Sequence, residues 1–122
     1  MGTTKNYNKL TGEITKFEYE TIGHIFDIPI IQSTEERNNG IPKYSHDSSS
    51  YVIYDRDKKR ITQVAFYDPN HEVDRRMDWE HGHKEFLIGS PHVQSFANNS
   101  TRQANEYEQK IFNEIKRRNF QP

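Results

Sequence analysis

Histidine and carboxylate side chains gather in one stretch of the sequence. Three of the six histidines, His81, His83 and His92, fall within twelve residues, and Asp78 comes shortly before them. An imidazole titrates near neutral pH, so it can take up and return a proton, and cleavage of RNA through its 2′-hydroxyl needs one group for each step. The stretch therefore predicts acid–base chemistry, with the three histidines as candidate catalytic residues.

Cationic side chains flank the same stretch. Arg75 and Arg76 precede it, and Lys84 lies within it. In phosphodiester cleavage, negative charge builds up on a pentacoordinate phosphorane, and a fixed cation stabilises that charge. We expect these three residues to be the substrate-binding contacts.

Two other interpretations of the histidines stay open. One is a divalent metal site, because a His-x-His pair with a third, distant histidine is a recognised set of three imidazole ligands, with Asp78 or Glu80 as a further ligand or as a partner of a ligand. Alternatively, the histidines are loop residues with no chemical role. Composition excludes other chemistry: the chain has no cysteine, so thiolate metal sites, disulfides and thiol nucleophiles are ruled out.

The elements that must hold these side chains follow from the hydrophobic pattern. Tyr51–Tyr54, Ile61–Tyr67 and Val73–Trp79 are strand-like runs joined by short polar turns, which predicts an antiparallel meander. In the third run, alternate residues are ionic, so one face is expected to carry Asp74, Arg76, Asp78 and Glu80. The other face is expected to carry Val73, Arg75, Met77 and Trp79. His92–Phe96 is a further candidate strand.

The ends of the chain differ in character. Residues 1–12 are polar and rich in asparagine, which predicts a flexible arm, with residues 13–122 as a single domain. Near the C-terminus, Ser100 and Gln103 fit a capping box. A helical stripe follows, made of Ala104, Tyr107, Ile111 and Ile115. We expect an α+β fold: an antiparallel meander sheet of four or five strands with the C-terminal helix packed on one face.

Composition limits the core and the partners. Of the 122 residues only 31% are hydrophobic, the mean hydropathy is −1.10 and the net charge is −1. A thin core is expected, and the charge does not favour bulk attraction to nucleic acid. No stretch is long and apolar enough to span a membrane, and no secretory signal is visible, so we expect no membrane partner.

Several short motifs between residues 38 and 96 together form a pattern that is similar to one in a known family. They are Asn39-Gly40-Ile41-Pro42-Lys43, Ser48-Ser49-Ser50, Tyr54-Asp55, Phe66-Tyr67-Asp68, Met77-Asp78-Trp79-Glu80-His81-Gly82-His83 and Pro91-His92-Val93. This pattern resembles a small domain found at the C-terminal ends of bacterial polymorphic toxins and in phage head-associated proteins. There, a hairpin with Tyr-Asp endings leads to an Asp-aromatic-x-His segment and then to Pro-His-Val-His.

The resemblance implies a toxin-like effector that acts on RNA and is neutralised by an immunity protein. It implies catalytic roles for His81, His83 and His92, with Asp78 as the orienting carboxylate. Gln94 departs from the pattern, because it stands where the second histidine of Pro-His-Val-His would be, and an amide cannot relay a proton. If that histidine is catalytic in the relatives, this copy is attenuated or inactive.

The function expected from the sequence is a metal-independent ribonuclease-like effector without a cofactor, acting in the cytoplasm or delivered into that of a target cell. The first alternative is a non-catalytic protein-binding module of phage or mobile-element origin. It is motivated by the neutral charge, by Gln94 and by the lack of a visible delivery domain. The second alternative is a metal-dependent nuclease or hydrolase.

Overall fold

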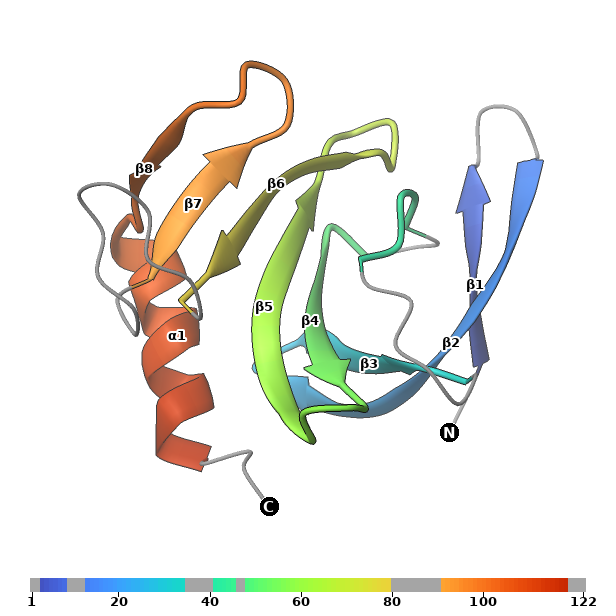
Figure 1. The fold of residues 1–122 in the computed structure, drawn as a ribbon, viewed down its shortest axis with the longest axis horizontal. Helices are drawn as coiled ribbons and strands as arrows, with labels where there is room; N and C mark the ends of the chain where they lie inside the picture. The colour runs from blue at the N-terminus through green and yellow to red at the C-terminus, as the bar shows by residue number, and fades with distance from the viewer. Residues whose placement is uncertain (1–2, 9–12, 35–40, 46–47, 80–90, 119–122) are drawn as a thin grey trace.

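The computed structural model describes residues 3–8, 13–34, 41–45, 48–79 and 91–118. These residues form one mixed β-sheet and one C-terminal helix (Figure 1). The elements in chain order are β1 (Thr3–Asn8), β2 (Glu13–Ile25), β3 (Ile28–Ser33), β4 (Ser50–Asp55), β5 (Arg60–Tyr67), β6 (Val73–Asp78), β7 (His92–Ser95), β8 (Thr101–Gln103) and α1 (Glu106–Arg118).

The sheet follows the chain order from β1 to β8, so consecutive strands are neighbours throughout. Every neighbouring pair is antiparallel except β3 and β4, which run parallel where Ile30 and Ile31 face Val52 and Ile53. The α+β class is thus confirmed, as are the meander β4–β6 and the strand after it. Two parts of the expectation are wrong: the described residues contain eight strands rather than four or five, and the parallel β3–β4 pair makes the sheet mixed rather than antiparallel.

The two edge strands of the sheet, β1 and β8, were not expected from the sequence, and each has a physical reason for giving little signal. The segment expected as a flexible arm, residues 1–12, contains β1, which pairs with β2 from Thr3 opposite Glu20 to Asn8 opposite Glu13. At the other edge, β8 has only three residues, paired with β7. Backbone hydrogen bonds form whatever the side chains are, so a polar or very short strand gives little hydrophobic signal.

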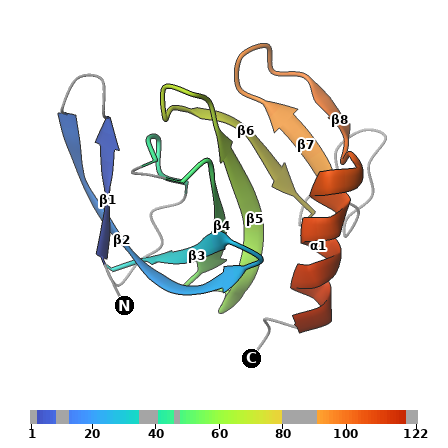
Figure 2. The ribbon, with the colours of Figure 1, turned by 180° about the vertical axis from the view of Figure 1, so that it is seen from behind.

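Side chains alternate between the two faces of the sheet, and each face has its own apolar cluster. On β5, Val64 and Phe66 join the larger cluster, whereas Ala65 and Tyr67 join a smaller one on the opposite face. The larger cluster also takes in the helix. Viewed from behind in Figure 2, α1 lies in front of the sheet beside β6, β7 and β8.

Helix α1 is attached to the larger cluster by its apolar stripe. Ile111, Phe112 and Ile115 are buried, and the Phe112 ring lies 5.0 Å from that of Trp79 between centroids. Tyr107, expected in this stripe, is instead 54% exposed. The helix is therefore packed on one face, as expected, but its apolar stripe contains Phe112 in place of Tyr107, and Ala104 precedes the helix.

The start of α1 differs from the sequence expectation. Ser100 and Gln103 do not cap the helix, because Gln103 belongs to β8. The capping box is made by Asn105 and Glu108: the Glu108 backbone N–H donates to Asn105 Oδ1 at 2.9 Å, and the Asn105 N–H donates to Glu108 Oε1 at 2.8 Å. An asparagine cap three residues before a glutamate offers the same reciprocal bonds as serine and glutamine.

Candidate functional site

Asp78 and His92 form a buried pair on neighbouring strands. They lie opposite each other in the β6–β7 register, and His92 Nε2 is 3.2 Å from Asp78 Oδ1. Their relative exposures are 5% for Asp78 and 4% for His92. The Asp78 carboxylate thus faces the imidazole ring of His92 across the two strands.

Arg76 and Gln94 extend this pair along the same face, because each lies two residues from a member of it. Arg76 Nε is 3.6 Å from Asp78 Oδ2, and Arg76 Nη2 donates to Gln94 Oε1 at 3.2 Å. Gln94 Nε2 in turn donates to Asn99 Oδ1 at 2.7 Å. We call Arg76, Asp78, His92 and Gln94 the β6–β7 polar cluster.

This arrangement gives Gln94 a definite role. Its amide oxygen holds the guanidinium of Arg76, and its amide nitrogen is held by Asn99. The side chain thus positions a cation rather than relaying a proton. A neutral amide suits this role because it can accept from Arg76 and donate to Asn99 at the same time.

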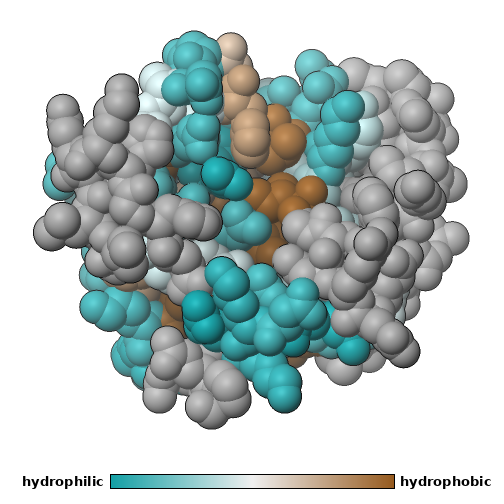
Figure 3. Space-filling model, in the orientation of Figure 1, coloured by the Kyte–Doolittle hydropathy of each residue, from teal (hydrophilic) through white to brown (hydrophobic). Residues whose placement is uncertain are grey.

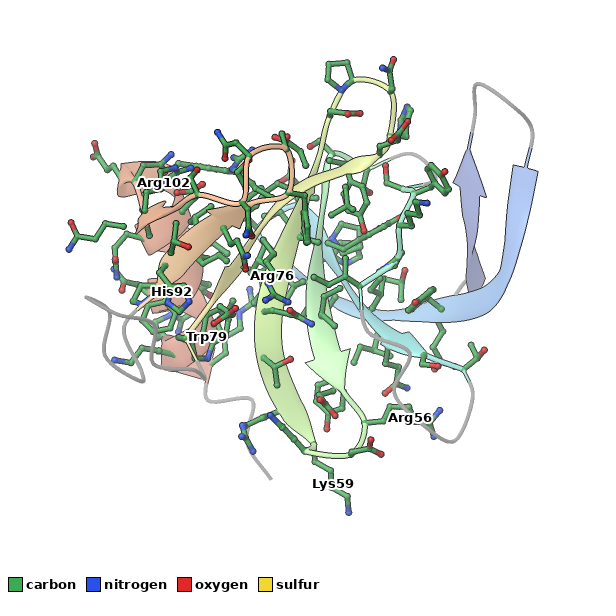
Figure 4. The ribbon with its side chains drawn as sticks, turned by 45° about the horizontal axis from the view of Figure 1, so that its top comes forward. Arg56, Lys59, Arg76, Trp79, His92 and Arg102 are labelled. Atoms are coloured by element: carbon green, nitrogen blue, oxygen red, sulfur yellow. The ribbon has the colours of Figure 1, made fainter. Side chains whose placement is uncertain are left out.

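A surface pocket of about 380 Å³ adjoins the cluster. Arg76 belongs to both the cluster and the pocket. The lining residues described by the structure are Ile41, Lys43, Gln63, Val73, Arg76 and Phe96. In Figure 4, Arg76 lies near the middle of the sheet with His92 to one side, whereas Arg56 and Lys59 lie at the distant β4–β5 turn. In the orientation of Figure 1, Figure 3 shows hydrophobic residues near the centre of the molecule, with hydrophilic ones above and below them.

The wall of the pocket that carries Lys43 is held against the sheet by hydrogen bonds. The Tyr67 hydroxyl donates to the Pro42 carbonyl at 2.5 Å, and the Val73 backbone N–H donates to the Lys43 carbonyl at 2.9 Å. Burial raises the pKa of the Tyr67 phenol well above its ordinary value, and the nearby Tyr51 and Tyr19 raise it further. The phenol therefore remains a hydrogen-bond donor at neutral pH.

Arg75, a predicted substrate contact, points to the opposite face of β6. Its Nε lies 3.1 Å from Glu108 Oε2, and its guanidinium carbon lies 4.3 Å from the centre of the Phe66 ring. Arg102 also binds the fully buried Glu108, through two hydrogen bonds of 2.8 and 2.9 Å. Arg75 thus fastens the helix to the sheet, and the structure does not bring it to the polar cluster.

The remaining predicted residues, His81, His83 and Lys84, lie outside the described residues, so their placement relative to His92 stays a prediction. Within the described ranges no group of three or more histidine, aspartate or glutamate side chains is arranged to hold a metal ion. No helix in those ranges is long and apolar enough to cross a membrane.

Of the six described pocket residues, the sequence pointed only to Arg76, and the polar and aromatic ones that it missed are Lys43, Gln63 and Phe96. Gln63 carried a usable signal, since its polar amide directly precedes the apolar residues Val64, Ala65 and Phe66 of β5. Phe96 was placed in a strand, but it follows β7 and is 48% exposed. Lys43 reaches the site only through the folding of the segment before β4, and no periodic pattern in the sequence predicts that folding.

Comparisons with protein-family profiles, with curated proteins and with solved structures found no match to this chain.

Proposed function

We propose that this domain is a ribonuclease-like effector that cleaves RNA by histidine acid–base chemistry. His92 transfers a proton, Asp78 orients and stabilises its imidazolium, and Arg76 contacts the phosphate. The observation that supports this proposal best is the position of Arg76, which lies 3.6 Å from Asp78 and lines the adjoining pocket. A cation is thereby held between a histidine–carboxylate pair and a space open to a ligand.

The proposed reaction is a transesterification within the RNA chain. The 2′-oxygen attacks the phosphorus as a base removes its proton, and the bond from phosphorus to the 5′-oxygen breaks as an acid protonates that oxygen. The products are a 2′,3′-cyclic phosphate and a 5′-hydroxyl. His92 supplies one of the two proton transfers, and His81 or His83 is the candidate for the other. Arg76 stabilises the phosphorane charge.

The partners proposed with this function come from the resemblance to toxin domains. They are an RNA substrate and an immunity protein that blocks the site, with action in the cytoplasm of the producing or of a target cell. The catalytic roles of His81 and His83 and the substrate contact by Lys84 belong to the same proposal.

The test is cleavage of a fluorogenic RNA by purified protein and by matched histidine variants. We expect His92→Ala to slow cleavage by about 100- to 10,000-fold, the usual contribution of a general acid or base. Asp78→Asn should also slow cleavage. His24→Ala is the matched control, because His24 is an exposed histidine on β2. Equal cleavage by folded wild-type protein and His92→Ala would refute the proposal.

One observation favours a second candidate, the non-catalytic protein-binding module. Asp78 and His92 are almost fully buried, as is common for paired polar groups that serve only the structure. Under this alternative, folded wild-type protein cleaves no RNA, and His92→Ala lowers the melting temperature without altering any activity. The same variant panel therefore separates the two candidates.

A further inference from the structure

Phe96 gives the pocket an aromatic surface that the core does not use. It is 48% exposed, and it lines the pocket together with Arg76. Its backbone is fixed, because the Phe96 N–H donates to the Asp74 carbonyl at 2.9 Å. A large aromatic ring held at the wall of a polar pocket is a suitable platform for stacking a planar ligand.

The charges around this ring favour an anion. Lys43 and Arg76 both line the pocket, and none of the six described lining residues is acidic. Arg76 donates a hydrogen bond from Nη2 to Gln94, and its Nε lies 3.6 Å from Asp78 Oδ2, so the guanidinium is oriented mainly by Gln94 while its side chain stays 35% exposed. A pre-positioned guanidinium binds a phosphate group with little loss of conformational freedom.

Gln63 completes the set of ligand-binding groups. It lies on β5 opposite Asp78 of β6, and it is partly exposed at the pocket. Its amide offers both a donor and an acceptor, which can pair with the edge of a nucleobase. An aromatic ring, two cations and an amide in about 380 Å³ match the base and the phosphate of one nucleotide.

From these contacts we propose that the pocket binds one unpaired nucleotide of single-stranded RNA. The base stacks on Phe96, its edge faces Gln63, and the phosphate lies on Arg76 and Lys43. The ligand is single-stranded because a base in a duplex is covered on both sides by its neighbours, whereas an unpaired base can turn out and stack on protein. This inference rests on the proposed function for the choice of RNA as the ligand.

The experiment measures binding without cleavage. The probe is a fluorescein-labelled hexauridine carrying 2′-O-methyl groups, which removes the 2′-hydroxyl needed for cleavage, and binding is followed by fluorescence anisotropy. We expect Phe96→Ala to weaken binding by about 5- to 150-fold, as loss of one stacked base does. Phe96→Tyr should retain binding. Phe26→Ala, which removes a ring that is 57% exposed at the β2–β3 turn, should leave it unchanged.

Two further binding measurements test which kind of ligand the pocket takes. A methylated duplex long enough to stay fully paired at the temperature of the assay should bind at least about tenfold more weakly than the single strand. Lys43→Ala should reduce the slope of log Kd against log salt by about 0.7, the value for one phosphate contact on a single strand. An unchanged slope would remove Lys43 from the proposed site.

The outcomes separate this inference from the proposed function. Binding that depends on Phe96, in a protein that cleaves no RNA, would support the nucleotide site and refute the ribonuclease. Cleavage that depends on His92, with equal binding by wild type and Phe96→Ala, would refute the nucleotide site alone. Equal affinity for the single strand and the duplex, or no binding to either, would also overturn it.

Discussion

Arg75 and Arg76 are adjacent in the chain but serve opposite faces of β6. Arg75 binds Glu108 on the helix side, whereas Arg76 binds Gln94 and lies beside Asp78 on the pocket side. The alternation of side chains in a strand causes this division. One arginine therefore belongs to the structural network of the helix, and its neighbour belongs to the candidate site.

This division predicts opposite effects of two matched substitutions. Arg76→Ala should slow RNA cleavage by about 100- to 1,000-fold, as removal of one oxyanion-stabilising donor does. Arg75→Ala should slow it far less and should instead lower the urea midpoint, because it removes a partner of the buried Glu108. Cleavage rates and urea denaturation of both variants check this. The reverse pattern would contradict the assignment of Arg76 to the site.

Glu108 is predicted to be a main contributor to the attachment of the helix. It accepts hydrogen bonds from Arg75, Arg102 and the Asn105 backbone while fully buried. Glu108→Gln should lower the free energy of unfolding by about 1–3 kcal/mol, since the amide cannot accept all of these bonds. Urea denaturation measures the loss. The matched control is Glu114→Gln, whose carboxylate pairs with Arg117 and Arg118 at the surface, and whose urea midpoint should stay near that of wild type.

The same carboxylate predicts an acid dependence of stability. Burial raises the pKa of Glu108, but hydrogen bonds from Arg102, the Asn105 N–H and Arg75 lower it more, so the pKa in the folded state lies below its ordinary value. The unfolded state then binds more protons in acid, and stability falls as the pH drops from the unfolded-state pKa through the folded-state value. Urea midpoints measured at successive pH values below 5 should show a smaller loss for Glu108→Gln than for wild type. Parallel curves would contradict this.

The raised pKa of Tyr67 predicts that the protein loses stability at alkaline pH. Because its pKa is raised in the folded state, the unfolded phenol ionises first, and stability is lost as the pH rises above the unfolded-state value of about 10. Tyr67→Phe should remove this contribution. It should also lower the free energy of unfolding at neutral pH by about 1 kcal/mol through loss of the bond to Pro42. Denaturation at pH 7 and pH 10.5 tests both effects, and an identical alkaline loss in the variant would refute the first.

The sequence predicted the strands correctly where the period of its hydrophobic residues agreed with the residue types of the turns. The alternation along β6 correctly placed Arg76 and Asp78 on one face and Met77 on the other, and the polar turns correctly joined β4, β5 and β6. Val73 departs from the expected face, because a register shift between Phe66 and Tyr67 interrupts the alternation at the start of β6.

The contacts of the candidate site depend on the register of paired strands and on residues that are far apart in the sequence. The pairing of Asp78 with His92 requires β6 and β7 to be neighbours in one particular register, and the sequence pattern does not fix that register for two residues 14 positions apart. Lys43 joins the pocket because the Tyr67 hydroxyl binds Pro42, a contact between residues 25 positions apart. Local pattern carries no information about such contacts.

The most direct test of the central claim is to identify the ends of the RNA fragments that the protein produces. Wild-type protein is incubated with a short RNA in the presence of EDTA, and the fragments are measured by mass spectrometry. The account predicts 2′,3′-cyclic phosphate and 5′-hydroxyl ends, formed in EDTA and lost in His92→Ala. Fragments with 3′-hydroxyl and 5′-phosphate ends that disappear in EDTA would contradict it and favour a metal-dependent nuclease. Intact RNA after incubation with folded wild-type protein would also contradict it.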